Sequence, residues 1–141
     1  MFSDPQAPAR LVLADDDPAV RSAVRMYIEW HCPEFVVVGE AGDGAAALKL
    51  VEAHDADVVL MDVRMPILDG LTATRILKEE IQHRAAVVLM TSLALHQLEE
   101  EAKTAGAAAV LRKPFPLGEL RSVLRACGGL TGEPPAPAAA G

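Results

Sequence analysis

The chain has 141 residues, of which 51% are hydrophobic, and its formal net charge is −7. This length suits one domain with a single core, and the composition is that of a globular protein rather than a disordered one. The acidic balance argues against nucleic-acid binding through a broad basic face. No apolar run approaches the roughly 18–20 residues of a membrane span, and the first residues lack the basic start of a secretory signal. Cys32 and Cys127 stand alone, as reduced thiols would. We therefore expect a cytoplasmic protein that binds neither membrane nor nucleic acid through this segment.

Short apolar runs alternate with helical patterns five times along the chain. The third and fourth runs are apolar throughout, which is typical of parallel strands covered on both faces. The predicted strands cover residues 11–14, 35–38, 58–61, 87–90 and 110–111.

Apolar residues at helical spacing follow each of these runs. The predicted helices begin at residues 18 and 44 and cover residues 71–81, 95–105 and 117–127, with Gly106 ending the fourth. Five consecutive strand–helix units require a parallel sheet with right-handed crossovers and helices on both faces. The sequence therefore predicts an α/β fold with a doubly wound, five-stranded parallel sheet.

The composition changes after residue 127, where Gly, Pro and Ala dominate and Glu133 is the only charge. Such a segment buries too little apolar surface to offset the entropy lost on ordering. We predict a short leader over residues 1–9, a folded domain over residues 10–127, and a flexible tail or linker over residues 128–141.

Polar side chains follow four of the predicted strands at the point where each strand ends. Asp15 and Asp16 follow the first strand, Asp62 the third, Thr91 the fourth, and Lys113 the fifth. Because ligands of an open parallel sheet bind at the carboxyl ends of its strands, we expect these groups to converge. Clustered carboxylates repel unless a cation compensates, and a small set of hard oxygen ligands suits Mg2+ better than Zn2+. The sequence therefore predicts a Mg2+ site at this edge.

Each of these residues alone has a simpler explanation. An acidic triplet before a helix is more often a cap that complements the helix dipole, and a lone lysine is usually a solvated charge. We interpret Asp17 and Asp69 as helix N-caps rather than site residues. The joint occurrence of these polar groups at four strand ends is what favours a chemical site.

Four sequence blocks resemble the receiver domains of two-component response regulators. They are LVLADDDP from Leu11, VLMDVRMPILDG from Val59, LMTS from Leu89, and RKPF from Arg112. The resemblance covers roughly residues 10–127, the expected receiver domain, and implies a flavodoxin-like fold with strand order 2-1-3-4-5.

The resemblance also implies the metal chemistry of the site. Asp62 would be the phosphoacceptor, taking a phosphoryl group from the phosphohistidine of a sensor histidine kinase or a phosphotransfer protein. Asp16 would bind Mg2+ directly, and Asp15 directly or through water. Arg64 would contribute only its backbone carbonyl to the metal, beside Asp62.

Two further residues match groups that contact the phosphoryl group in the family. Thr91 matches the switch hydroxyl, and Lys113 matches the lysine that pairs with a phosphoryl oxygen. The bond between Lys113 and Pro114 is expected to be cis. The domain would not be an enzyme beyond its own phosphorylation and autodephosphorylation.

Signal output departs from the family pattern, because Val110 replaces the usual aromatic residue three positions before the lysine. Coupling should then run through the backbone after Thr91, near residues 93–96. The face made by the fourth helix, fifth strand and fifth helix would carry partner binding or a homodimer. Four residues are expected near this face, namely Leu95, Leu98, Arg112 and Arg121.

Residues 35–44 resemble receivers attached to LuxR-type helix-turn-helix regulators. The tail is then either a linker to a missing DNA-binding output domain or the end of a stand-alone receiver.

Two other functions remain open. One is a receiver-like module that binds a partner without phosphorylation, which the intact set of site residues argues against. The other is a haloacid-dehalogenase-like phosphatase, whose DxD motif residues 15–17 technically contain.

Overall fold

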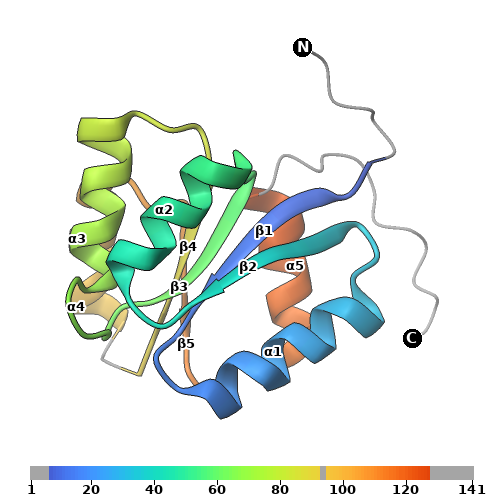
Figure 1. Cartoon of the computed structure of the whole chain (residues 1–141). Coiled ribbons are helices and arrows are strands. Elements are labelled where there is room, and N and C mark those ends of the chain that lie inside the picture. The colour runs from blue at the N-terminus through green and yellow to red at the C-terminus, as the bar shows by residue number, and fades with distance from the viewer. Residues whose placement is uncertain (1–6, 93–94, 128–141) are drawn as a thin grey trace.

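The predicted strands form one parallel sheet in the computed structural model, which describes residues 7–92 and 95–127 (Figure 1). The strand order is β2-β1-β3-β4-β5, which confirms the flavodoxin-like (βα)5 prediction. Most of the expected leader and the whole expected tail, residues 128–141, lie outside the described residues. The strands are β1 (Ala9–Ala14), β2 (Phe35–Ala41), β3 (Val58–Asp62), β4 (Ala86–Thr91) and β5 (Ala109–Arg112).

Helices cover both faces of this sheet. α1 and α5 lie on one face, and α2, α3 and α4 lie on the other (Figure 1). The helices are α1 (Pro18–His31), α2 (Gly44–His54), α3 (Gly70–Arg75), α4 (Leu95–Ala105) and α5 (Leu117–Cys127). Among the described helices, none is both long enough and apolar enough to cross a membrane.

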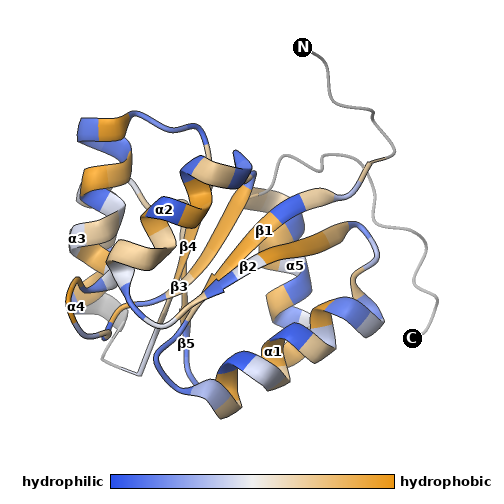
Figure 2. Ribbon diagram, in the orientation of Figure 1, coloured by the Kyte–Doolittle hydropathy of each residue, from blue (hydrophilic) through white to orange (hydrophobic). Residues whose placement is uncertain are grey.

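The core consists of two apolar layers, one on each side of the sheet. In β1, Leu11 and Leu13 pack into the layer under α1 and α5, whereas Val12 and Ala14 pack into the layer under the other helices. All four side chains are fully buried. Figure 2 shows the central strands as hydrophobic and the helices as hydrophobic on only part of their surface. This pattern explains why the central strands lack a polar alternation.

Short polar caps set where the helices start and stop. The side chains of Asp17, Asp43 and Asp69 each accept hydrogen bonds from backbone N–H groups in the first turns of α1, α2 and α3. The caps predicted at Asp17 and Asp69 are therefore confirmed. Gly106 has φ +103° and follows the end of α4, as predicted.

One predicted helix changes geometry half-way. After α3 the chain continues as a π-helical segment, η1 (Ile76–Ile81), which ends at Gln82 with φ 59°. The Lys78 ammonium inside η1 donates hydrogen bonds to the backbone carbonyls of His83 and Ala85. Apolar spacing marks the buried side of such a segment but does not separate a π turn from an α turn, because both bury one face.

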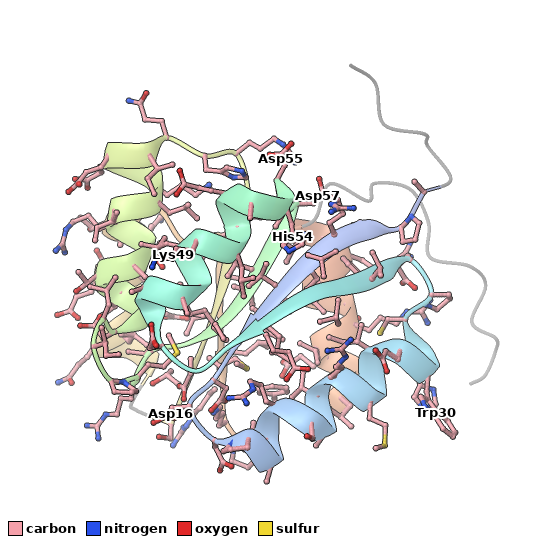
Figure 3. The ribbon with its side chains drawn as sticks, in the orientation of Figure 1. Asp16, Trp30, Lys49, His54, Asp55 and Asp57 are labelled. Atoms are coloured by element: carbon pink, nitrogen blue, oxygen red, sulfur yellow. The ribbon has the colours of Figure 1, made fainter. Side chains whose placement is uncertain are left out.

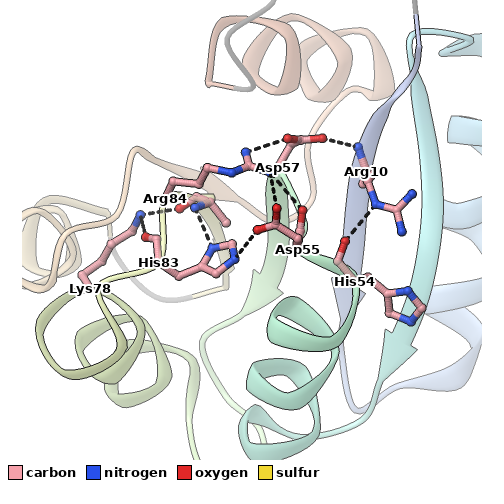
Figure 4. Close-up of polar contacts among 8 residues, drawn as sticks. Arg10, His54, Asp55, Asp57, Lys78, His83 and Arg84 are labelled. Atoms are coloured by element: carbon pink, nitrogen blue, oxygen red, sulfur yellow. Dashed lines mark hydrogen bonds and ion pairs between the residues drawn. The ribbon is translucent and has the colours of Figure 1, made fainter. Parts of the chain in front are cut away.

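The amino-terminal edge of the sheet is held by a polar network at the end opposite to the predicted site (Figures 3 and 4). The Asp57 carboxylate accepts a hydrogen bond from the Arg10 backbone N–H at 2.7 Å and from the Arg84 guanidinium at 2.6 Å. The His83 Nε2 lies 2.9 Å from an Asp55 oxygen. This network ties the start of β1 to the loops before β3 and β4.

Candidate phosphoryl-transfer and metal site

Polar groups from β1, β3 and the end of β5 meet at the carboxyl edge of the sheet. The Lys113 ammonium donates to Asp15 Oδ2 at 2.8 Å and to Asp62 Oδ2 at 3.3 Å. The Lys113 backbone N–H donates to the Thr91 carbonyl at 2.7 Å, which joins this residue to the end of β4. The Lys113–Pro114 peptide bond is cis, as expected. The convergence of these residues follows from parallel topology, which puts all carboxyl ends at one edge.

Three carboxylates surround one small volume at this edge. Asp15, Asp16 and Asp62 each offer an oxygen, and these oxygens lie within 4.8 Å of one another. Asp15 is fully buried and Asp62 is 9% exposed, whereas Asp16 is exposed (labelled in Figure 3). All the donors are hard oxygens, without sulfur or imidazole, and one side of the cluster is open to water. This donor set fits Mg2+.

The charges of the cluster shift two pKa values. The pKa of Asp62 is raised, because burial disfavours its charged form and Asp15 repels it, and the nearby Lys113 ammonium only partly offsets this. Burial by itself would lower the pKa of Lys113, but the hydrogen bond to Asp15 and the charge of Asp62 outweigh it, so the Lys113 pKa is raised. The environment therefore favours the charged form of Lys113 and disfavours the charged form of Asp62.

The loop after Asp62 is folded tightly under the acceptor. The Gly70 N–H donates to the Val63 carbonyl at 2.8 Å. A Cβ at position 70 would lie 2.3 Å from the Asp62 carbonyl oxygen, so only glycine fits there. Asp69 caps α3 in the same turn. Asp69 and Gly70 thus shape the backbone that carries Asp62.

The acidic loop after β1 consists of residues 15–17, of which the first two belong to the site and the third caps α1. Asp15 Oδ1 accepts the Asp17 backbone N–H at 2.9 Å, and Asp17 Oδ1 accepts the Ala19 N–H at 2.9 Å. Asp17 is thereby engaged as a cap and is exposed, which argues against its acting as the acid/base of a phosphatase. Arg21 donates to the Asp15 backbone carbonyl at 2.7 Å. Sequence reasoning did not single out this contact.

The other two expected site residues lie at the same edge. Thr91 is buried and ends β4, one position beyond Met90, which pairs with Asp62. Arg64 is exposed, and its backbone N–H donates to the Asp62 carboxylate. Arg64 and Asp16 both line an open cavity of about 540 Å3 beside the acceptor.

The expected output face is only partly as predicted. Val110 is half-buried between two open cavities of about 420 and 380 Å3. Near this face Arg112 is exposed, whereas Leu98 is buried in the core with its side chain toward the sheet. Arg121 pairs with Glu34, on the side of α5 that faces the α1–β2 connection. Residues 93–94 and the side chain of Leu95 lie outside the described part of the chain.

The fold and the site together define the structural class of this domain. It is a doubly wound α/β domain with a cluster of carboxylates, bridged by a lysine, at the carboxyl edge of its sheet. The family model described as response regulator receiver domain matches residues 11–125, and the chain belongs to that family. Residues 11–125 therefore form a response regulator receiver domain of two-component signal transduction.

Individual relatives agree with this assignment. The chain is 38% identical over 119 residues to the transcriptional regulatory protein PdtaR of Mycobacterium tuberculosis, which covers 84% of this chain and 56% of the relative. The chain thus spans about half the length of that relative.

Two solved structures are similar over most of the chain. A two-component response regulator of the LuxR family from Aurantimonas superposes with a TM-score of 0.80 at 31% identity, covering 86% of each chain. The receiver domain of a sensor histidine kinase from Pseudomonas aeruginosa PAO1 superposes with a TM-score of 0.75 at 30% identity, covering 87% of this chain and 99% of that one. The latter has a magnesium ion coordinated in its active-site cleft.

Proposed function

We propose that Asp62 accepts a phosphoryl group from the phosphohistidine of a sensor histidine kinase or phosphotransfer protein, in a reaction that depends on Mg2+. The observation that carries this proposal is the lysine-bridged cluster: three carboxylate oxygens within 4.8 Å of one another, two of them from residues bonded to Lys113. A purely structural ion pair needs one carboxylate, and the second and third add repulsion that a cation must offset.

The metal would be held by Asp15, Asp16 and Asp62, with the Arg64 carbonyl as a further ligand. Asp16 is the exposed member of the cluster and would bind the ion directly. Asp15 already bonds Lys113 and the Asp17 N–H, so it would bind directly or through water. Bound Mg2+ would supply positive charge next to the phosphoryl oxygens. The magnesium in the Pseudomonas aeruginosa receiver supports this assignment.

In the transfer, a carboxylate oxygen of Asp62 attacks phosphorus and forms an O–P bond. The P–N bond to the donor imidazole breaks, and the electron pair leaves with the imidazole nitrogen. Lys113 exchanges its contact with Asp62 for a phosphoryl oxygen, and the Thr91 hydroxyl contacts another. The resulting acyl phosphate hydrolyses, which returns the free carboxylate. The domain needs no other catalytic activity.

Output would pass through the face made by α4, β5 and α5. Val110 lines two open cavities on this face. A valine has few χ1 states and cannot swing as a tyrosine can. The phosphorylated form would use this face for partner binding or a homodimer, and a DNA-binding output domain would belong to a longer regulator.

The test is phosphorylation by a small donor. The wild-type chain with phosphoramidate and Mg2+ should gain one alkali-labile phosphoryl group by intact mass, and EDTA should prevent it. Asp62→Asn should gain none. Asp57→Asn is the matched control, because Asp57 flanks the opposite end of β3, and it should react as wild type does. Labelling of Asp62→Asn at the wild-type rate, or sustained turnover of a phosphatase substrate, would contradict the proposal.

A further inference from the structure

The backbone carbonyl between the first two aspartates of the acidic loop is held by a cation from α1. Arg21 Nη1 donates to the Asp15 carbonyl oxygen at 2.7 Å. That oxygen belongs to the peptide unit joining Asp15 to Asp16, and a peptide unit is planar. A bond to its oxygen therefore restrains both Cα atoms from which the two carboxylates branch. The contact acts on the relative placement of the two side chains.

Arg21 is itself oriented by a charged partner on the neighbouring strand. Its Nε donates to a Glu40 oxygen at 3.1 Å, and Glu40 lies in β2. Arg25, one turn later in α1, donates to the other Glu40 oxygen. Hydrogen bonds from Arg25 and Arg21 lower the Glu40 pKa despite its partial burial, so Glu40 remains an anion that holds both guanidinium groups. Of these two arginines, Arg21 donates to the acidic loop, whereas Arg25 donates to Glu40 and Glu29.

We propose that Arg21 is a positioning residue for Mg2+ binding, which sets the spacing of the Asp15 and Asp16 carboxylates without touching the ion. This inference rests on the proposed metal site. The direction of the effect separates positioning from simple electrostatics. A guanidinium near a cation site repels the cation, so loss of its charge alone would tighten Mg2+ binding. Loss of positioning would weaken it.

Arg25 provides a matched control within the same helix. Arg21→Met and Arg25→Met remove the same charge, and each removes one ion pair to Glu40. Arg25→Met also removes the exposed pair to Glu29 within α1, so it is the more disruptive of the two for the helix. Arg21→Met also removes the bond to the Asp15 carbonyl. A general loss of the α1–β2 connection would affect both variants alike.

The experiment is a calorimetric Mg2+ titration of the full chain, with melting temperatures measured in EDTA. We expect Arg21→Met to raise the Kd for Mg2+ about tenfold, which is the effect expected from the loss of one charge-assisted hydrogen bond. Arg25→Met should keep the wild-type Kd or bind slightly more tightly. Arg21→Lys, which keeps the charge but offers one nitrogen in place of the guanidinium fork, should lie between wild type and Arg21→Met.

An unchanged or tighter Kd in Arg21→Met, or equal weakening in both Met variants, would overturn the inference. Should Arg21→Met fail to fold, Arg21→Lys carries the comparison, and a wild-type Kd would count against positioning. Asp16→Asn tests the premise separately. If Asp16→Asn bound Mg2+ as wild type does, the proposed metal site would fail rather than the role of Arg21.

Discussion

Without metal, the Asp62 carboxylate faces two like charges and one opposite charge. Its repulsion from Asp15 and from Asp16, with oxygens up to 4.8 Å apart, is about 3.5 kcal/mol each at an effective dielectric near 20. Its attraction to Lys113 at 3.3 Å is about 5 kcal/mol on the same scale. The repulsions exceed the attraction by about 2 kcal/mol, which solvent screening reduces to about 1 kcal/mol. Burial of the carboxylate, the largest cause of its raised pKa, adds to the cost of its charge. Asp62→Asn should therefore stabilise the metal-free protein.

The pKa of Asp62 gives this prediction a pH dependence. Because the folded-state pKa is raised, the folded protein binds this proton more tightly than the unfolded chain does. The protonated group favours the folded state below the ordinary carboxyl pKa of about 3.9, and this advantage is lost as the pH rises through the raised folded value. The stability that Asp62→Asn adds to the folded protein should therefore increase from acid to neutral pH and then level off.

The assay is thermal unfolding followed by circular dichroism in EDTA, repeated with Mg2+. In EDTA at neutral pH, Asp62→Asn should melt about 3–5 °C above wild type. Mg2+ should raise the melting temperature of wild type more than that of the variant, since binding to the folded state stabilises it. Asp57→Asn, which loses its ion pair to Arg84, should melt lower than wild type. A lower melting temperature for Asp62→Asn in EDTA, or equal Mg2+ shifts, would refute the reasoning.

Three further substitutions separate structural from functional effects. Gly70→Ala should lower the free energy of unfolding by about 2–3 kcal/mol in urea titrations and slow phosphorylation, because its Cβ meets the Asp62 carbonyl. Ile67→Gly should raise stability by about 0.5–1 kcal/mol, since Ile67 has φ 69° and a side chain that is 82% exposed. Arg84→Ala should lower stability by about 0.5–1 kcal/mol yet leave the rate of phosphoramidate labelling unchanged, because Arg84 lies at the opposite edge.

The sheet and the main site groups could be predicted because both depend on local pattern and on one topological rule. Continuous apolar runs mark β3 and β4, and parallel topology then brings the residues after the strands together. Asp15, Asp62 and Lys113 meet for this reason, although residue 113 lies 98 positions after residue 15. The caps at Asp17 and Asp69 follow from short-range hydrogen bonding, which sequence also reveals.

The remaining features depend on contacts between distant segments. β2 continues to Ala41, beyond the predicted end at residue 38, because a register shift opposite Leu11 and Val12 lets the strand go on pairing. The π-helical segment η1 has no apolar spacing that distinguishes it from an α-helix, so neither its geometry nor the contacts of Lys78 could be predicted. Arg21 looks like any polar residue on α1 until the fold brings the Asp15 carbonyl to its guanidinium. Leu98, expected near the output face, is buried in the core, because its helical spacing fits the buried stripe of α4.

The central claim is that Asp62 alone carries the phosphoryl group. Borohydride reduction of the phosphorylated wild-type chain converts an aspartyl phosphate to homoserine, and peptide mass mapping then locates it. We expect homoserine at position 62 only, in samples treated with phosphoramidate and Mg2+ and not in those treated with EDTA. Homoserine at position 15 or 16, or none at position 62 in a chain that has gained a phosphoryl group, would contradict the account.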